Sequence, residues 1–178
     1  MVPRLKTAKS HSLPAWRARE NHAEHQQRAL AVLKQFRLIY GSARQQFRQI
    51  EESCGVSGSQ LWLMHELARA PDIGVSEVAH RLSIHQTTCS QLVEKLVARG
   101  YVIKTRSRED QRRVGLALSA AGQRLLANAP GPAVGVLPEA LLTLSDTTLN
   151  TLAAQLAKVI AQLHAPDENA ADKPLADL

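Results

Sequence analysis

Polar side chains suited to base and phosphate contacts gather at the start of one short helical pattern. A Gln side chain can pair with both hydrogen-bonding positions of adenine, and Ser and Thr hydroxyls can contact bases or phosphates. The set comprises Gln86, Thr87, Thr88, Ser90 and Gln91, with Lys95 one turn further on. This composition is typical of a helix that reads double-stranded DNA in the major groove. The alternative is an ordinary amphipathic helix with a polar outer face.

A second basic group follows in a short tip between two strand-like runs. The tip from Arg106 to Arg113 holds four Arg and no Lys, namely Arg106, Arg108, Arg112 and Arg113, together with Asp110. Asp110 and Arg112 are two residues apart, so in a turn the carboxylate can orient the guanidinium. A guanidinium held in this way suits the narrow minor groove. The alternative is a solvated hairpin tip whose charges only keep the protein soluble.

The elements that must position these side chains follow from apolar spacing and helix caps. We expect helices from Ser76 to Leu82 and from Gln86 to Arg99, joined by the turn Ser83–His85. Cys89, Leu92, Val93, Leu96 and Val97 form the apolar face of the second helix. The ribbon strands are expected at Tyr101–Thr105 and Val114–Leu118. The predicted fold is mainly α, a winged helix-turn-helix with a small β-ribbon wing and terminal helices that form a dimerisation region.

Two narrow apolar seams lie on the terminal helices. In the long helical pattern from His22 to Glu52, apolar residues follow a 3-4 spacing at Leu33, Phe36, Tyr40, Ala43, Phe47 and Ile50. The same rhythm returns at Leu149, Leu152, Leu156, Val159 and Leu163. A two-fold homodimer would bury both seams, with Leu33 and Phe36 from the first and all five residues of the second at the interface. The alternative is that the seams pack on each other within one chain.

The predicted organisation has five parts. They are a flexible basic arm over 1–20, an N-terminal dimerisation helix over 21–57, a DNA-binding lobe over 58–119, C-terminal dimerisation helices over 120–164, and an acidic disordered tail over 165–178. Within the lobe, Ser59 is expected to cap one helix and Ser76 the next, while Ser119 and Ser145 begin later helices. Pro138 is placed near a helix start.

Charge and cysteine content narrow the class of protein. The net charge of +6 is unevenly distributed: residues 1–52 hold ten Lys/Arg against four acids, residues 99–113 hold six against two, and the tail 165–178 has a net charge of −3. Two basic segments in a chain of 178 residues are what a polyanion partner would need. Cys54 and Cys89 indicate no disulfide framework, and no apolar run reaches the ~20 residues of a membrane span. We expect a cytoplasmic protein without a membrane partner or cofactor, neither an enzyme nor a metal protein.

Taken in order, these motifs resemble the MarR family of bacterial transcriptional regulators. The resemblance spans roughly residues 60–163. It is carried by Gln60-Leu61-Trp62, Val78-Ala79-His80-Arg81-Leu82, Thr87-Thr88-Cys89-Ser90-Gln91-Leu92-Val93, Leu96-Val97-Ala98-Arg99-Gly100-Tyr101-Val102, Asp110-Gln111-Arg112-Arg113 and Leu118-Ser119-Ala120-Ala121-Gly122. The ordered set is specific, whereas no single piece is.

The resemblance implies a dimer whose two winged-helix lobes read a pseudo-palindromic operator, with Arg112 held by Asp110 in the minor groove. It also implies a repressor that releases DNA when a small aromatic or phenolic ligand, such as an aromatic carboxylate, binds between the lobe and the dimerisation region. Three features depart from the usual pattern: the extended N-terminal arm, Cys89 in place of a branched aliphatic, and Gln91 where a basic residue is common.

The ligand-sensing residues are the least specified by the sequence. An aromatic acid needs an apolar slot and one cation, which points to Tyr40, Arg44, Phe47, Trp62 and His65. Phe47 and Trp62 also suit an ordinary core position. Two alternatives remain open: a regulator of the same fold that senses oxidants through cysteine, and a dimeric interaction module without DNA binding.

Overall fold

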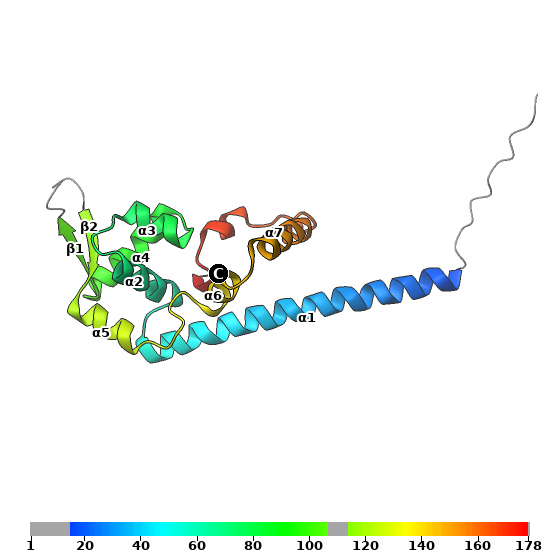
Figure 1. Ribbon diagram of the computed structural model, residues 1–178, viewed down its shortest axis with the longest axis horizontal. Coiled ribbons are helices and arrows are strands. Elements are labelled where there is room, and N and C mark those ends of the chain that lie inside the picture. Colours follow the sequence, from blue (N-terminus) through cyan, green and yellow to red (C-terminus); the bar gives the residue numbers. More distant parts are fainter. Residues whose placement is uncertain (1–14, 107–113, 178) are drawn as a thin grey trace, which may run out of the picture. The chain divides into compact units, whose positions relative to one another are not determined.

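Helices account for most of the chain, as the apolar spacing predicted. The computed structural model describes residues 15–106 and 114–177 (Figure 1). The helices are α1 (Ala15–Cys54), α2 (Gly58–Arg69), α3 (Val75–Leu82), α4 (Gln86–Ala98), α5 (Ala120–Asn128), α6 (Val136–Leu142) and α7 (Asp146–Ile160). Strands β1 (Val102–Arg106) and β2 (Val114–Leu118) form an antiparallel sheet, and two short 3₁₀ helices, η1 (Glu168–Asp172) and η2 (Leu175–Asp177), follow α7. The mainly α fold with a two-stranded wing is thus confirmed.

The chain divides into two units, residues 1–40 and residues 41–178. In the first unit, the described residues form the N-terminal part of α1. Every side chain from residue 22 to residue 40 is exposed, including Leu33 and Phe36. Helix α1 begins at Ala15, so the helix extends into the segment predicted to be a flexible arm over 1–20.

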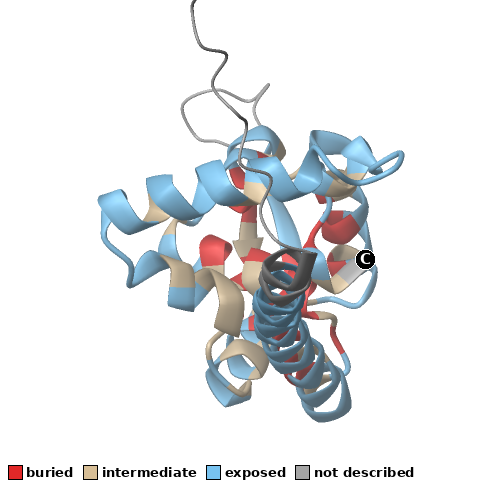
Figure 2. Ribbon diagram, turned by 90° about the vertical axis from the view of Figure 1, so that its right-hand side faces the viewer, coloured by how far each residue is buried: buried red, intermediate tan, exposed pale blue. Residues whose placement is uncertain are grey.

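The second unit has one apolar core, in which α2 takes the central part. Leu61, Leu63, Met64 and Leu67 of α2 are fully buried. Figure 2 colours the buried residues red. These α2 side chains pack with the inner faces of α3 and α4, with the base of the β ribbon, and with the last turns of α1 through Ile50. The lobe that presents α4 and the ribbon is therefore a packed body rather than a loose array of helices.

Helix caps explain where the lobe helices begin, and two of the predicted caps were wrong. Ser57, not Ser59, caps α2: its hydroxyl accepts from the Gln60 amide, and the Gln60 side chain accepts from the Ser57 amide. Helix α3 begins after Gly74 rather than at Ser76. The predicted start at Ser119 is confirmed, since its hydroxyl accepts from the Gly122 amide.

The C-terminal part of the second unit contains α6, α7 and the two 3₁₀ helices. Ser145 caps α7 as predicted, with Asp146 in its first turn. The tail predicted to be disordered over 165–178 is instead placed against the lobe: Pro174 is buried and Ala176 is half-buried. The sequence Pro174-Leu175-Ala176 makes an apolar contact with the lobe, which the acidic composition of the tail did not predict. Among the described residues, every helix is too short or too polar to span a membrane.

Candidate nucleic-acid interface

Helix α4 is held on the lobe by its apolar face and by the turn before it. Ser83 adopts a left-handed conformation with φ of 52°, and its amide donates to the His80 carbonyl. The Ile84 amide donates to the Ala79 carbonyl over 3.0 Å, which closes the end of α3. Cys89, Leu92, Val93 and Leu96 are buried, and Val97 is half-buried. The helix-turn-helix predicted from the sequence is therefore formed.

The opposite face of α4 presents the polar side chains singled out in the sequence. Gln86, Thr87, Gln91 and Lys95 are exposed, whereas Thr88 and Ser90 are half-buried. The Ser90 hydroxyl donates to the Gln86 carbonyl over 2.9 Å, so its remaining capacity is that of an acceptor. The first two turns of α4 thus offer two Gln side chains and two Thr hydroxyls to a partner outside the lobe.

The β ribbon begins directly after α4. Its register pairs Val102 with Leu118 and Arg106 with Val114, so residues 107–113 connect the ends of the two strands. Val102 and Leu116 are buried in the lobe core, which fixes the ribbon by its base, and Lys104 is exposed on β1. Four of the predicted wing residues, Arg108, Asp110, Arg112 and Arg113, lie outside the described residues, as does the side chain of Arg106.

Contacts of Ser119 and Arg99 fix the direction in which the ribbon leaves the lobe. The Ser119 hydroxyl donates to the Gly100 carbonyl over 2.7 Å, and the Ser119 amide donates to the Tyr101 carbonyl over 3.0 Å. At the end of α4, the Arg99 guanidinium lies over the Tyr101 ring, 5.1 Å from its centroid, and donates to the Gly55 carbonyl. These contacts join α4, the ribbon and the start of α5 into one rigid corner.

Neither cysteine has the environment of a reactive thiolate. Cys89 is fully buried, and burial raises its pKa from 9.0 to about 11. Its Sγ lies 3.6 Å from the Val75 carbonyl oxygen, to which the protonated thiol donates. Burial also raises the pKa of Cys54, which is half-buried. These environments disfavour the oxidant-sensing alternative, because the thiolate is the reactive form.

A cleft lies between the lobe and the helices that follow it. Its volume is about 440 Å³, and it is lined by Trp62, Glu66 and Arg69 of α2, Arg81 of α3, Val134, and Pro138, Leu141, Leu142 and Leu149 of α6 and α7. The Glu66 carboxylate is largely buried, and each of its oxygens lies 3.9 Å from a guanidinium nitrogen, one from Arg69 and one from Arg81. Arg81 also donates to Glu77 over 2.8 Å. This cleft combines apolar walls with two cations.

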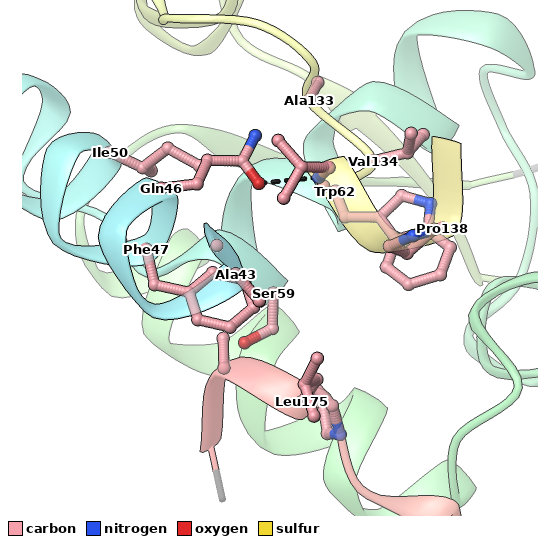
Figure 3. A pocket seen from close by; sticks show the side chains of 15 residues that line it. Ala43, Gln46, Phe47, Ile50, Ser59, Trp62, Ala133, Val134, Pro138 and Leu175 are labelled. Atoms are coloured by element: carbon pink, nitrogen blue, oxygen red, sulfur yellow. Dashed lines mark hydrogen bonds between the residues drawn. The ribbon is translucent and has the colours of Figure 1, made fainter. Parts of the chain in front are cut away.

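A second, smaller cavity is also lined by Trp62 (Figure 3). Its volume is about 30 Å³. Gln46 of α1 is buried beside it, donates to the Pro132 carbonyl over 2.8 Å and accepts from the Val136 amide over 2.7 Å. Phe47 and Ile50 of α1, Pro138 of α6, and Leu175 also line it.

The predicted ligand residues are only partly brought together. Trp62 lines both cavities and Phe47 lines the smaller one, whereas Arg44 is exposed and His65 lines neither. Tyr40 belongs to the first unit and is exposed. Arg69 and Arg81 of the cleft were not among the predicted residues, although Arg81 lies in the motif Val78-Ala79-His80-Arg81-Leu82. In the described part of the chain no cluster of three metal-ligating side chains occurs.

Comparison with known proteins agrees with this geometry. Residues 55–113 match the model of the MarR family. The likeness to this family therefore covers about a third of the chain, the segment from the end of α1 to the start of β2. Members of that family are transcription regulators rather than enzymes, and the chain has the fold of such a regulator. No curated protein matches the chain.

Several solved structures are similar to this chain. The apo form of wild-type MarR from E. coli is 22% identical, with 70% of this chain and 95% of that chain covered and a TM-score of 0.46. BldR from Sulfolobus solfataricus is 21% identical, with 79% and 96% covered and a TM-score of 0.49. PcaV from Streptomyces coelicolor, in complex with its natural ligand, is 18% identical, with 89% and 99% covered and a TM-score of 0.45.

Proposed function

We propose that this chain is a MarR-type, sequence-specific DNA-binding regulator that acts as a repressor. The observation that carries the proposal is the exposed polar first turn of α4, held on a packed lobe beside a β ribbon. Gln86 and Gln91 are free to reach base edges in the major groove, and Lys95 and Lys104 are free to meet phosphates. The Arg-rich segment from Arg106 to Arg113 would reach the adjacent minor groove.

We further propose that the protein acts as a homodimer on a pseudo-palindromic site. The exposed apolar side chains of the two terminal helices support this. Helix α7 has no buried residue among its described side chains: Leu152 and Val159 are exposed, and Leu149 and Leu156 are half-buried. Leu163, in the turn that follows α7, is exposed too. In the other unit, Leu33 and Phe36 are exposed as well. Apolar surface of this extent is typical of an interface, because association removes it from water.

The ligand is proposed to be an aromatic carboxylate bound in the 440 Å³ cleft. This volume lies within the ~300–1,000 Å³ range of small-molecule sites. The Trp62 indole and the leucines of α6 and α7 offer the apolar walls, and Arg69 or Arg81 offers the cation. Glu66 already faces both guanidinium groups at 3.9 Å, so a ligand carboxylate would have to compete with it. Because the cleft joins the lobe to α6 and α7, its filling would alter the spacing of two lobes in a dimer.

A mobility-shift titration tests the DNA-binding proposal. DNA from upstream of the protein's own gene is titrated at two salt concentrations with excess nonspecific competitor. We expect a discrete complex that survives competitor and weakens as salt rises. A smear that moderate salt abolishes would contradict sequence-specific binding. Titration of the same complex with benzoate and salicylate tests release, with Arg81→Gln as the variant expected to lose the response and Arg44→Gln as the matched control.

A further inference from the structure

The C-terminal segment reaches the lobe at two places, of which the first is the small cavity beside Trp62. Pro174 is buried there, and Leu175 and Ala176 line the cavity together with Phe47 and Ala43 of α1. Figure 3 labels Leu175, Phe47 and Ala43 around it. With this segment in place, the volume that remains in the cavity is only about 30 Å³. The segment therefore closes a cavity that would otherwise be open on that side.

The second place is the residue that precedes α4. The His85 amide donates to the Asp172 carbonyl over 3.1 Å, and the His85 Nε2 lies 3.2 Å from an Asp172 carboxylate oxygen. His85 is the N-cap of α4, and its own side chain makes no capping bond. Asp172 is thus bound at the end of the helix that presents Gln86 and Thr87.

The charge of the segment opposes a nucleic acid at the same location. Residues 165–178 contain four acidic residues and one lysine, for a net charge of −3. Lys173 lies 3.6 Å from Asp167, so the one cation is engaged within the segment. Phosphates approaching the first turn of α4 would come within the ~10 Å over which charges interact at moderate salt. The docked segment would repel them, and its backbone would occupy space beside His85.

We propose that residues 166–177 are an autoinhibitory segment that docks on the lobe and excludes DNA from the start of α4. The segment has an apolar anchor, Pro174 to Ala176, and a polar clamp, Asp172 on His85. Loosening either one releases the other, because only two residues separate Asp172 from Leu175. The proposal rests on the proposed DNA-binding function, which it extends by a regulatory contact within the chain.

Two variants of the full chain separate docking from simple charge. Asp172→Asn weakens the clamp and removes one negative charge. Glu168→Gln removes the same charge from η1, and Glu168 makes no hydrogen bond or ion pair with the described residues. Leu175→Ser weakens the apolar anchor without changing the charge, and Leu175 is 39% exposed, so folding of the lobe does not depend on it.

Hydrogen exchange and DNA affinity are measured on the three variants and on the unaltered chain. We expect Asp172→Asn and Leu175→Ser to speed exchange of the His85 amide and to tighten DNA binding at low salt by about fivefold or more, the range of a modest coupling between sites. Glu168→Gln should leave exchange unchanged and alter affinity less. Unchanged exchange in both docking variants would overturn the docking.

Faster exchange without tighter DNA binding would overturn the inhibition. Equal affinity gains for Asp172→Asn and Glu168→Gln would also overturn it, because the effect would then depend on net charge and not on docking. Because exchange is measured without DNA, the docking is tested even if the chain fails to bind DNA. If no variant forms a specific complex with DNA, both the proposed function and the inhibition are contradicted. The exchange result still shows whether the segment docks on the lobe.

Discussion

Gly122 of α5 lies directly against the backbone of Tyr101, so closely that a Cβ atom on Gly122 would overlap the Tyr101 carbonyl oxygen. The carbonyl cannot withdraw easily, because it accepts a hydrogen bond from the Ser119 amide. Only glycine fits at this corner, where the ribbon returns to the lobe. The Leu-Ser-Ala-Ala-Gly sequence at 118–122 thus has a physical requirement at its last position.

Gly122→Ala is therefore expected to destabilise the lobe. Forcing a methyl group into this contact must shift the backbone of β1 or of α5, and overpacking of this kind costs about 1–3 kcal/mol. Urea unfolding followed by circular dichroism measures the change. Gly41→Ala is the matched control: a Cβ at Gly41 meets nothing within 4 Å, and alanine favours an exposed helix by about 0.5–1 kcal/mol. Equal stability of the two variants would contradict this account.

The capping box at the start of α2 leads to a second prediction. Ser57→Ala removes the acceptor for the Gln60 amide, and loss of an N-cap costs about 0.5–2 kcal/mol of unfolding free energy. Ser76→Ala serves as its control, because Ser76 is exposed in the first turn of α3 and follows the actual cap position. Thermal unfolding should separate the two variants by several degrees. A larger loss from Ser76→Ala would mean that the sequence-based placement of the caps was right.

The secondary structure of the lobe could be predicted from the sequence because apolar spacing and helix caps are local signals. Apolar spacing placed α4, and Ser119 and Ser145 marked helix starts through bonds to amides three residues later. Ser57 was overlooked because Gly58 follows it, and glycine is unfavourable within a helix. Gly58 instead occupies the first position of α2. At such a position, the neighbouring Ser and the Gln three residues on decide the outcome more than the glycine does.

The candidate site was harder to predict where it depends on contacts distant in sequence. The cleft brings Arg69 and Arg81 to one carboxylate, Glu66, and the fold alone decides that α2 and α3 meet there. The docking of Asp172 on His85 joins residues 87 positions apart, and no periodicity marks it. The polar face of α4 was predictable for the opposite reason, because exposed and buried positions alternate within a single helix.

Cys89 is expected to be unreactive in the folded protein. With a pKa of about 11, its thiolate is scarce at pH 8, and its side chain is fully buried. Alkylation by iodoacetamide, followed by mass spectrometry, should modify Cys54 before Cys89 in buffer and both at similar rates in urea. Since the folded pKa lies above the ordinary value of 9.0, the stabilisation from the protonated thiol is present below pH 9 and is lost as pH rises through 11. Rapid peroxide oxidation of native Cys89 would restore the oxidant-sensing alternative.

Substitutions in the wing and in helix α4 should change DNA binding in different ways. Arg112→Ala is expected to weaken binding to every sequence and to lower the salt slope by about one unit, since one phosphate-region contact is lost. Gln91→Ala should instead change the preferred bases, because Gln91 is exposed on the polar face of α4. Fluorescence anisotropy on two operator variants measures both. Arg124→Ala, an exposed arginine on α5 outside the helix-turn-helix and the ribbon, is the control. An unchanged affinity in Arg112→Ala would refute the role of the wing.

The exposed seam on α7 gives the sharpest test of assembly. Leu152 is 37% exposed on a helix without buried side chains, so Leu152→Glu costs the single chain little. In a dimer the same change would place a carboxylate in an apolar interface, where an unpaired charge is strongly disfavoured. We expect sedimentation equilibrium to show a dimer for the unaltered chain and a monomer for Leu152→Glu at micromolar concentration. Asn150→Glu, an exposed position on the same helix, should leave the dimer intact.

The DNA result should follow the assembly result. An operator with two half-sites gains affinity only if both lobes bind together, so Leu152→Glu should lose most of its affinity for that operator and little of its affinity for one half-site. If Leu152→Glu is still a dimer, the dimer interface does not lie on this face of α7. If the unaltered chain is a monomer, the exposed apolar side chains of α7, Leu152, Val159 and Ile160, need a different partner, and a single lobe would then have to supply all of the DNA affinity.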